Sequence, residues 1–189
     1  MNGLTGIGSY SNIQLHLIYF KDPPIDIMQK LMSLNPKSVM IPDKEGDLPL
    51  HFACLSDSSF EVIKLLVDAC PEGRNIVGEL GNAPLHCVLL QEYYDALLRP
   101  EMEDVTQALL TDEVIRIKDH GGHMPLELFA FRSQQQQHNN ADDVNNNDNN
   151  NNLDDATSKI GKLLIESYPK ECHKLLMTKK HMALPRDYV

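Results

Sequence analysis

The chain is poor in the residues that several classes of protein need. Among its 189 residues there is no tryptophan, and aromatic side chains make up only 6%. Its 17 basic residues are outnumbered by 27 acidic ones, which gives a net charge of −10. Nucleic acids and anionic membranes both attract positive surface, so this balance argues against either partner. No run of about 18 apolar residues occurs, so no transmembrane helix is expected.

Cysteine is also sparse, with thiols at Cys54, Cys70, Cys87 and Cys172 and no Cys-x-x-Cys pair. The first residues, MNGLTG, contain neither a charged region nor a long apolar run, so no secretory signal is visible. Residues 1–9 are expected to form a flexible leader. We therefore expect four free thiols and an intracellular protein, either cytoplasmic or nuclear.

Motifs of the common enzyme classes are missing. The sequence contains no Gly-x-Ser-x-Gly elbow, no His-Glu-x-x-His motif and no phosphate-binding loop. Acidic pairs such as Glu101 and Glu103 lie in a polar stretch, where nothing would desolvate a carboxyl group for acid catalysis. We expect no catalytic residue, no cofactor and no metal site, and we predict that the chain is not an enzyme.

One phrase recurs along the chain. Residues 49–54 read PLHFAC, residues 84–89 read PLHCVL and residues 125–130 read PLELFA. The copies begin 35 residues apart (49 to 84) and then 41 residues apart (84 to 125). A weaker copy, LHLI, precedes them at residues 15–18. Self-similarity at this period indicates a stacked repeat protein, and such proteins usually act by presenting a surface.

Each copy is followed by a second apolar run with helical spacing. Val62, Leu65 and Leu66, for example, lie at positions i, i+3 and i+4, on one face of a helix. Proline fits the first turn of a helix but disrupts its interior, so prolines mark the boundaries. The predicted unit is a short helix, a turn, a longer helix and a loop. First helices are predicted to begin at Pro49, Pro84 and Pro125; second helices contain residues 25–32, 60–67, 105–110 and 160–165, with Pro36, Pro71 and Pro169 beyond their ends.

Residues 133–155 differ from the rest of the chain. They are mainly glutamine, asparagine and aspartate, with almost no apolar side chain to offset the entropy of ordering. We expect a disordered insertion between the two helices of the fourth unit, at a cost of roughly 1.5–2 kcal/mol by the logarithmic loop law. A tolerated surface insertion is favoured over a role in self-association, which such tracts can also promote.

Residues 43–53 read DKEGDLPLHFA, with Leu48 just before the proline. This stretch resembles the ankyrin-repeat signature Asp-x-x-Gly-x-Thr-Pro-Leu-His-x-Ala at every position except Leu48, which replaces threonine. In a later copy Glu127 replaces the histidine, and residues 183–189 look like the start of a further unit. The other matching residues are Leu15 and His16, then Gly81, Pro84, Leu85 and His86, then Asp119, Gly122, Pro125, Leu126 and Ala130.

The resemblance implies an all-α fold, an ankyrin-like helical-hairpin solenoid of four divergent repeats plus a partial fifth. The repeats would occupy residues 10–132 and continue over residues 156–189. Loops would project to one side and, with the first helices, line a concave groove that binds another protein. These loops would be residues 42–47, 76–82, 116–123 and 177–181, and the candidate contact residues are Lys44, Glu45, Glu79, Leu80, Lys118 and His120.

We therefore expect a monomeric, non-catalytic scaffold or adaptor that binds an unidentified protein partner. An alternative from another class is the regulatory or targeting ankyrin region of an enzyme whose catalytic domain is not in this chain. A kinase, ligase or channel pattern downstream in the reading frame would favour that alternative.

Histidines and cysteines suggest a third hypothesis, a small metal or redox protein. His51 and Cys54 lie at i, i+3, and stacking would bring His86 and Cys87 near them. The resemblance implies instead that the histidine after Pro-Leu is structural and bonds across the loop that leads into the helix. In the stretch HGGH, residues 120–123, the glycines favour a tight loop over a metal site or pH sensor. Stoichiometric zinc in purified protein would favour the third hypothesis.

Overall fold

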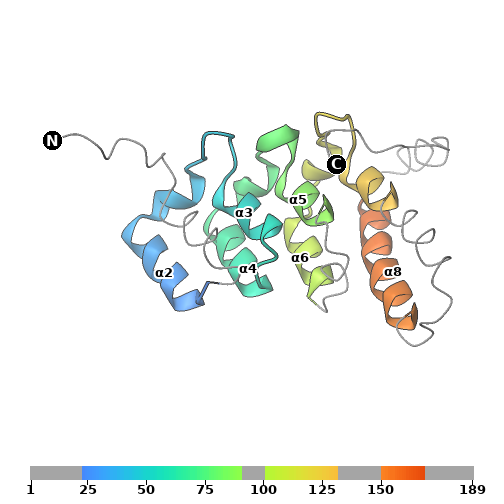
Figure 1. Ribbon diagram of the computed structural model, residues 1–189, viewed down its shortest axis with the longest axis horizontal. Helices are drawn as coiled ribbons and strands as arrows, with labels where there is room; N and C mark the ends of the chain where they lie inside the picture. Colours follow the sequence, from blue (N-terminus) through green and yellow to red (C-terminus); the bar gives the residue numbers. More distant parts are fainter. Residues whose placement is uncertain (1–22, 91–100, 132–149, 169–189) are drawn as a thin grey trace.

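A computed structural model describes residues 23–90, 101–131 and 150–168, and residues 150–158 by their backbone alone. Within these ranges all regular structure is helical, and no strand is present (Figure 1). The α-helices are α2 (Ile25–Leu34), α3 (Pro49–Leu55), α4 (Phe60–Ala69), α5 (Pro84–Leu90), α6 (Met102–Leu109), a helix over residues 125–131, and α8 (Asn150–Ser167). Short 3-10 helices are η1 (Pro36–Met40), η2 (Pro71–Asn75), η3 (Glu79–Gly81) and η5 (Val114–Arg116).

The predicted helix starts at Pro49, Pro84 and Pro125 are confirmed, because each proline is the first residue of a helix. Leu48, which precedes the first of them, has extended backbone (φ −79°, ψ 163°), as steric contact with the proline ring requires. The prolines after α2 and α4 do more than end those helices. Each begins a 3-10 helix, and the residues before them, Asn35 and Cys70, have nearly the same backbone angles.

The helices form two layers in a row. In one layer α2 packs against α4, α4 against α6 and α6 against α8. In the other, α3 packs against α5, and each of these short helices also packs against the longer helix that follows it. Figure 1 shows the row running from α2 (blue) at one end to α8 (orange) at the other. Each helix pair therefore contacts mainly the pairs next to it.

The hydrophobic core follows the same row. It extends without a break from Met28 in α2 through Leu66 and Leu85 to Ile160 in α8, all of them buried. Burying one such side chain contributes about 1.5–3 kcal/mol. Polar groups add contacts between neighbouring pairs, since Asn75 in η2 bonds both the Thr111 hydroxyl (2.6 Å) and the Glu113 carboxylate (2.7 Å). Among the described residues, the buried apolar side chains of all the helix pairs thus belong to one shared cluster.

Two boundaries differ from the sequence prediction. Helix α8 begins at Asn150, inside the segment 133–155 that was expected to be a disordered loop, so the predicted end of that loop is wrong. Once the packed residues near Ile160 have formed a helix, each further turn requires no new nucleation and can extend into a polar sequence. Helix α6 ends at Leu109, so Leu110 of the predicted run 105–110 lies just beyond it. The helix begins at Met102, which also packs in the core.

Several predictions lie outside the described residues: the leader 1–9, the first copy at Leu15 and His16, most of the insertion and the partial fifth repeat. Among the helices that the structure describes, none combines the length and the apolar character needed to cross a membrane.

Candidate interaction surface

Three loops with the same backbone fold lie at one edge of the row. In each, the N–H of the first residue donates to the carbonyl oxygen of the fifth, over 2.9–3.0 Å. The fourth residue is glycine with positive φ, which L side chains rarely adopt. These bonds join Asp43 to Asp47, Gly78 to Asn82 and Asp119 to His123, and the glycines are Gly46 (φ 95°), Gly81 (74°) and Gly122 (83°).

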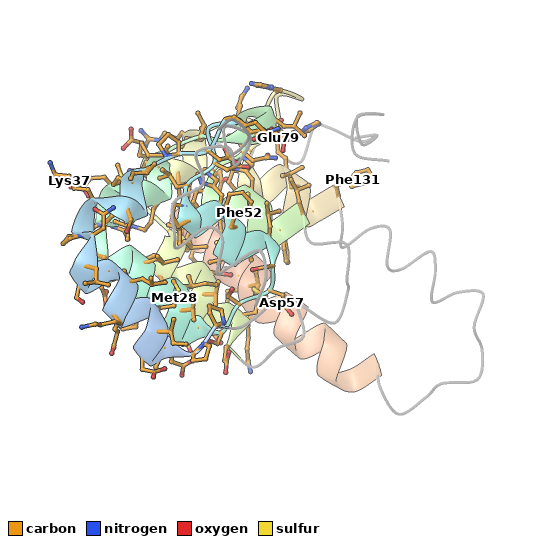
Figure 2. The ribbon with its side chains drawn as sticks, turned by 60° about the vertical axis from the view of Figure 1, so that its left-hand side comes forward. Met28, Lys37, Phe52, Asp57, Glu79 and Phe131 are labelled. Atoms are coloured by element: carbon orange, nitrogen blue, oxygen red, sulfur yellow. The ribbon has the colours of Figure 1, made fainter. Side chains whose placement is uncertain are left out.

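Direct hydrogen bonds join the three loops side by side. The N–H of Glu79 donates to the Asp47 carboxylate of the first loop over 3.0 Å. The N–H of His120 in the third loop donates to the carbonyl oxygen of Leu80 in the second over 2.8 Å. We call residues 41–47, 76–82 and 117–123 together the loop ridge. Figure 2 places Glu79 on this outer edge, away from Met28 between the helices.

Two buried histidines fix the loops to the helices. The N–H of Leu48 donates to Nδ1 of His51 over 3.0 Å, and the opposite nitrogen, Nε2, donates to the carbonyl oxygens of Ile76 (3.1 Å) and Asn82 (3.2 Å) in the next loop. Both nitrogens of the ring are therefore used by the backbone. This geometry supports the structural role expected for His51 and leaves no ring nitrogen for a metal.

His86 repeats this arrangement one pair further along. Its Nδ1 accepts from the N–H of Ala83 over 3.2 Å, and its Nε2 donates to the carbonyl oxygen of His123 over 3.3 Å. In the third copy Glu127 stands in the histidine position, and its Oε2 accepts from the N–H of Met124 over 2.9 Å. The carboxylate thus accepts the hydrogen bond that Nδ1 accepts in the other copies. The sequence analysis treated Glu127 only as a departure from the signature and did not predict this role.

His120 and His123 have different environments. The Asp119 carboxylate is buried and contacts His123 twice. Its Oδ1 accepts from the backbone N–H of His123 over 2.7 Å, and its Oδ2 lies 3.3 Å from Nδ1 of the His123 ring. His120 is exposed. The HGGH stretch forms a tight loop, and no group of three His, Cys, Asp or Glu residues in the described parts of the chain could hold a metal ion.

The six candidate contact residues are all exposed and all lie on the loop ridge. Lys44 and Glu45 of the first loop form an ion pair with each other over 2.9 Å. Each of the other loops also contributes two, Glu79 and Leu80 from the second and Lys118 and His120 from the third. The structure therefore brings together residues that are up to 76 positions apart (44 to 120).

The middle loop also carries exposed apolar residues that the sequence reading passed over. Ile76 is 37% exposed and Val77 is 48% exposed, next to Leu80 at 37%. The sequence could have indicated this, because three large apolar residues within one predicted surface loop are unusual in a loop that contacts only water. Leu80 has φ 55°, one of two non-glycine residues with positive φ among those described. The other, Asp57, belongs to a residue type that tolerates this conformation better.

The thiols of Cys54 and Cys87 are poor nucleophiles. Cys54 and Cys87 are buried in α3 and α5. Burial raises the pKa of both thiols well above the ordinary value, because a thiolate would lose its hydration there. They act as small apolar side chains of the core.

The chain was compared with families and sequences of known proteins. No protein-family model matches it, and no curated protein matches it with significant similarity.

Proposed function

We propose that the chain is a divergent ankyrin-like solenoid, with four helix pairs and the start of a fifth, that binds another protein and catalyses no reaction. The binding surface is the loop ridge on the concave side of the stack. The observation that carries this proposal is the joining of three loops, edge to edge, with exposed side chains at every tip. Loops whose backbones are already ordered lose little entropy when a partner binds.

The exposed surface near the ridge comes from the loops rather than from the first helices. In α5 all residues from Pro84 to Leu89 are buried, so this helix supports the loops without offering side chains of its own. The loops offer charged groups of both signs around the apolar residues Ile76, Val77 and Leu80. An apolar centre with a polar rim is the usual composition of a protein interface.

Leu80 combines a strained backbone with a partly exposed side chain. A left-handed conformation costs about 1–2 kcal/mol for an L residue other than glycine, and the side chain is partly exposed rather than buried in the core. Strained residues of this kind concentrate at functional sites. We infer that Leu80 is the apolar anchor of the interface.

A substitution at Leu80 separates binding from stability. Leu80→Gly is expected to change the free energy of unfolding by no more than about 1 kcal/mol, because relief of the left-handed strain offsets the added chain entropy and the lost partial burial of the side chain. The same variant is expected to lose partner binding, measured by quantitative capture from the native cell extract. Leu55→Ala is the matched control, since Leu55 is 48% exposed at the far end of α3 and should leave capture unchanged. A Leu80→Gly protein that binds normally would contradict the anchor role.

The charged part of the ridge is tested by a triple variant, Lys44→Ala, Glu79→Ala and His120→Ala. It is expected to weaken capture of the partner at least tenfold while circular dichroism stays unchanged, since all three side chains are exposed. The control carries Glu61→Ala, Lys64→Ala and Gln107→Ala, which are exposed on α4 and α6, away from the ridge. Unchanged capture of every partner by the ridge variant would remove the proposal.

A further inference from the structure

Two buried imidazoles hold the loop ridge in register, and both must be neutral to do so. Nδ1 of His51 and of His86 accepts a hydrogen bond from a backbone N–H three residues earlier. An imidazole nitrogen can accept only when it carries no proton. The opposite nitrogen is then the donor, and it reaches carbonyl oxygens of the following loop. Protonation would place two N–H donors against each other at both sites.

The surroundings also oppose a charge on these rings. Both histidines are 0% exposed. Burial lowers the pKa of both imidazoles below the ordinary 6.5, and this effect exceeds the opposing ones. The groups that favour the charged form are Asp47 and Asp43 near His51 and Asp119 near His86, together with the carbonyls of Ile76, Asn82, His123 and Ile117, while His123 itself disfavours a charge on His86.

We propose that the loop ridge is an acid-sensitive element, in which protonation of His51 and His86 breaks the bonds that their Nδ1 atoms accept from Leu48 and Ala83, displaces both rings and so loosens the loops that they hold. The layer of α2, α4, α6 and α8 is held by apolar contacts that contain neither histidine. The loops are therefore released before the long helices separate. If the ridge binds the partner, as proposed above, acid also weakens that binding.

The direction of the pH dependence follows from proton linkage. A released histidine titrates near 6.5, whereas in the closed ridge it titrates at lower pH. The released state therefore binds more protons below pH 6.5, and the closed ridge is at full strength only above that value. Between the two pKa values, each unit of falling pH shifts the ratio of closed to released ridge by up to tenfold per histidine, and by up to about a hundredfold for two.

Amide hydrogen exchange, followed by NMR and normalised to intrinsic rates, tests the proposal without any partner. Between pH 7.5 and 5.5 the N–H groups of Leu48, Glu79, Ala83 and His120 should lose protection relative to those of Leu66 and Val67 in α4, by up to tenfold for each histidine that titrates. Ridge protection that stays constant, or that falls only together with the protection of α4, would overturn the proposal.

Variants identify the groups responsible. His51→Gln with His86→Gln keeps an oxygen acceptor at each site, as Glu127 does naturally, but removes the titration. The pH dependence of ridge exchange should then disappear. If the double variant is unfolded by circular dichroism, each single variant should still remove up to tenfold per pH unit. His120→Gln is the matched control, since this histidine is exposed on the same ridge and should change nothing.

A pH dependence that is as steep in both single variants as in the original protein would refute the role of the histidines. Such a result would leave partner binding by the ridge untouched, because the exchange measurement involves no partner. Conversely, if variants of Leu80 and of the charged loop residues showed that the ridge binds no partner, the acid response would still stand.

Discussion

Leu85→Ala is expected to lower the free energy of unfolding by about 2–5 kcal/mol, the range found when a large buried side chain is truncated. Leu85 is 0% exposed in α5 and belongs to the core that joins the layers. Helix α5 contacts α3, α6 and η2, so the cavity would weaken contacts to both sides of the stack. Because domains of this size are stable by only about 5–15 kcal/mol, a large share of the total would be lost.

Urea denaturation followed by circular dichroism measures this effect. Leu34→Ala is the matched control, because Leu34 is 71% exposed in α2 and surface substitutions usually change stability by less than about 0.5 kcal/mol. Equal losses in the two variants would mean that Leu85 does not lie in a shared core. A loss in Leu85→Ala alone supports the dependence of each helix pair on its neighbours.

The helix starts could be predicted from the sequence because they depend on local sterics. Proline fixes its own φ and restricts the residue before it, whatever the tertiary surroundings. The starts at Pro49, Pro84 and Pro125 therefore held in a chain whose repeats are divergent. Five of the six candidate contact residues lie four or five positions before one of these prolines, and the sixth, Lys118, lies seven positions before Pro125; all six are exposed, as the repeat frame predicted.

The contacts between loops could not be predicted from the sequence. The bond from the N–H of Glu79 to Asp47 spans 32 residues, and it depends on how closely two helix pairs stack. The left-handed conformation of Leu80 has the same origin, because its carbonyl oxygen must meet the N–H of His120. No local preference of leucine would indicate this conformation.

The role of Glu127 could have been predicted from the sequence. It counted as a departure from the signature, although a glutamate three residues after Met124 is placed to accept from that residue's N–H, as in a capping box. The side chain at this position must accept a hydrogen bond from the N–H three residues earlier, and both imidazole and carboxylate can do so. A motif that allowed any hydrogen-bond acceptor at this position would have matched all three copies.

Gly81→Ala is expected to lower the free energy of unfolding by about 2–4 kcal/mol, from left-handed strain of about 1–2 kcal/mol and a steric contribution of similar size. An added Cβ would lie 2.8 Å from Cδ2 of His120 and 3.0 Å from its backbone nitrogen. Relieving that contact moves the third loop away from the second. The bond from His120 to the carbonyl oxygen of Leu80, which joins these loops, would then be lost.

Gly122→Ala is the control that isolates the steric part. Gly122 has φ 83°, close to the 74° of Gly81, yet an added Cβ would meet nothing within 4 Å. It should therefore cost only the strain, about 1–2 kcal/mol. Urea denaturation gives both values, and exchange of the His120 amide should accelerate in Gly81→Ala alone. If the two alanine variants were equally stable and equally protected, the loops would not be packed against each other, and the ridge would be three separate loops.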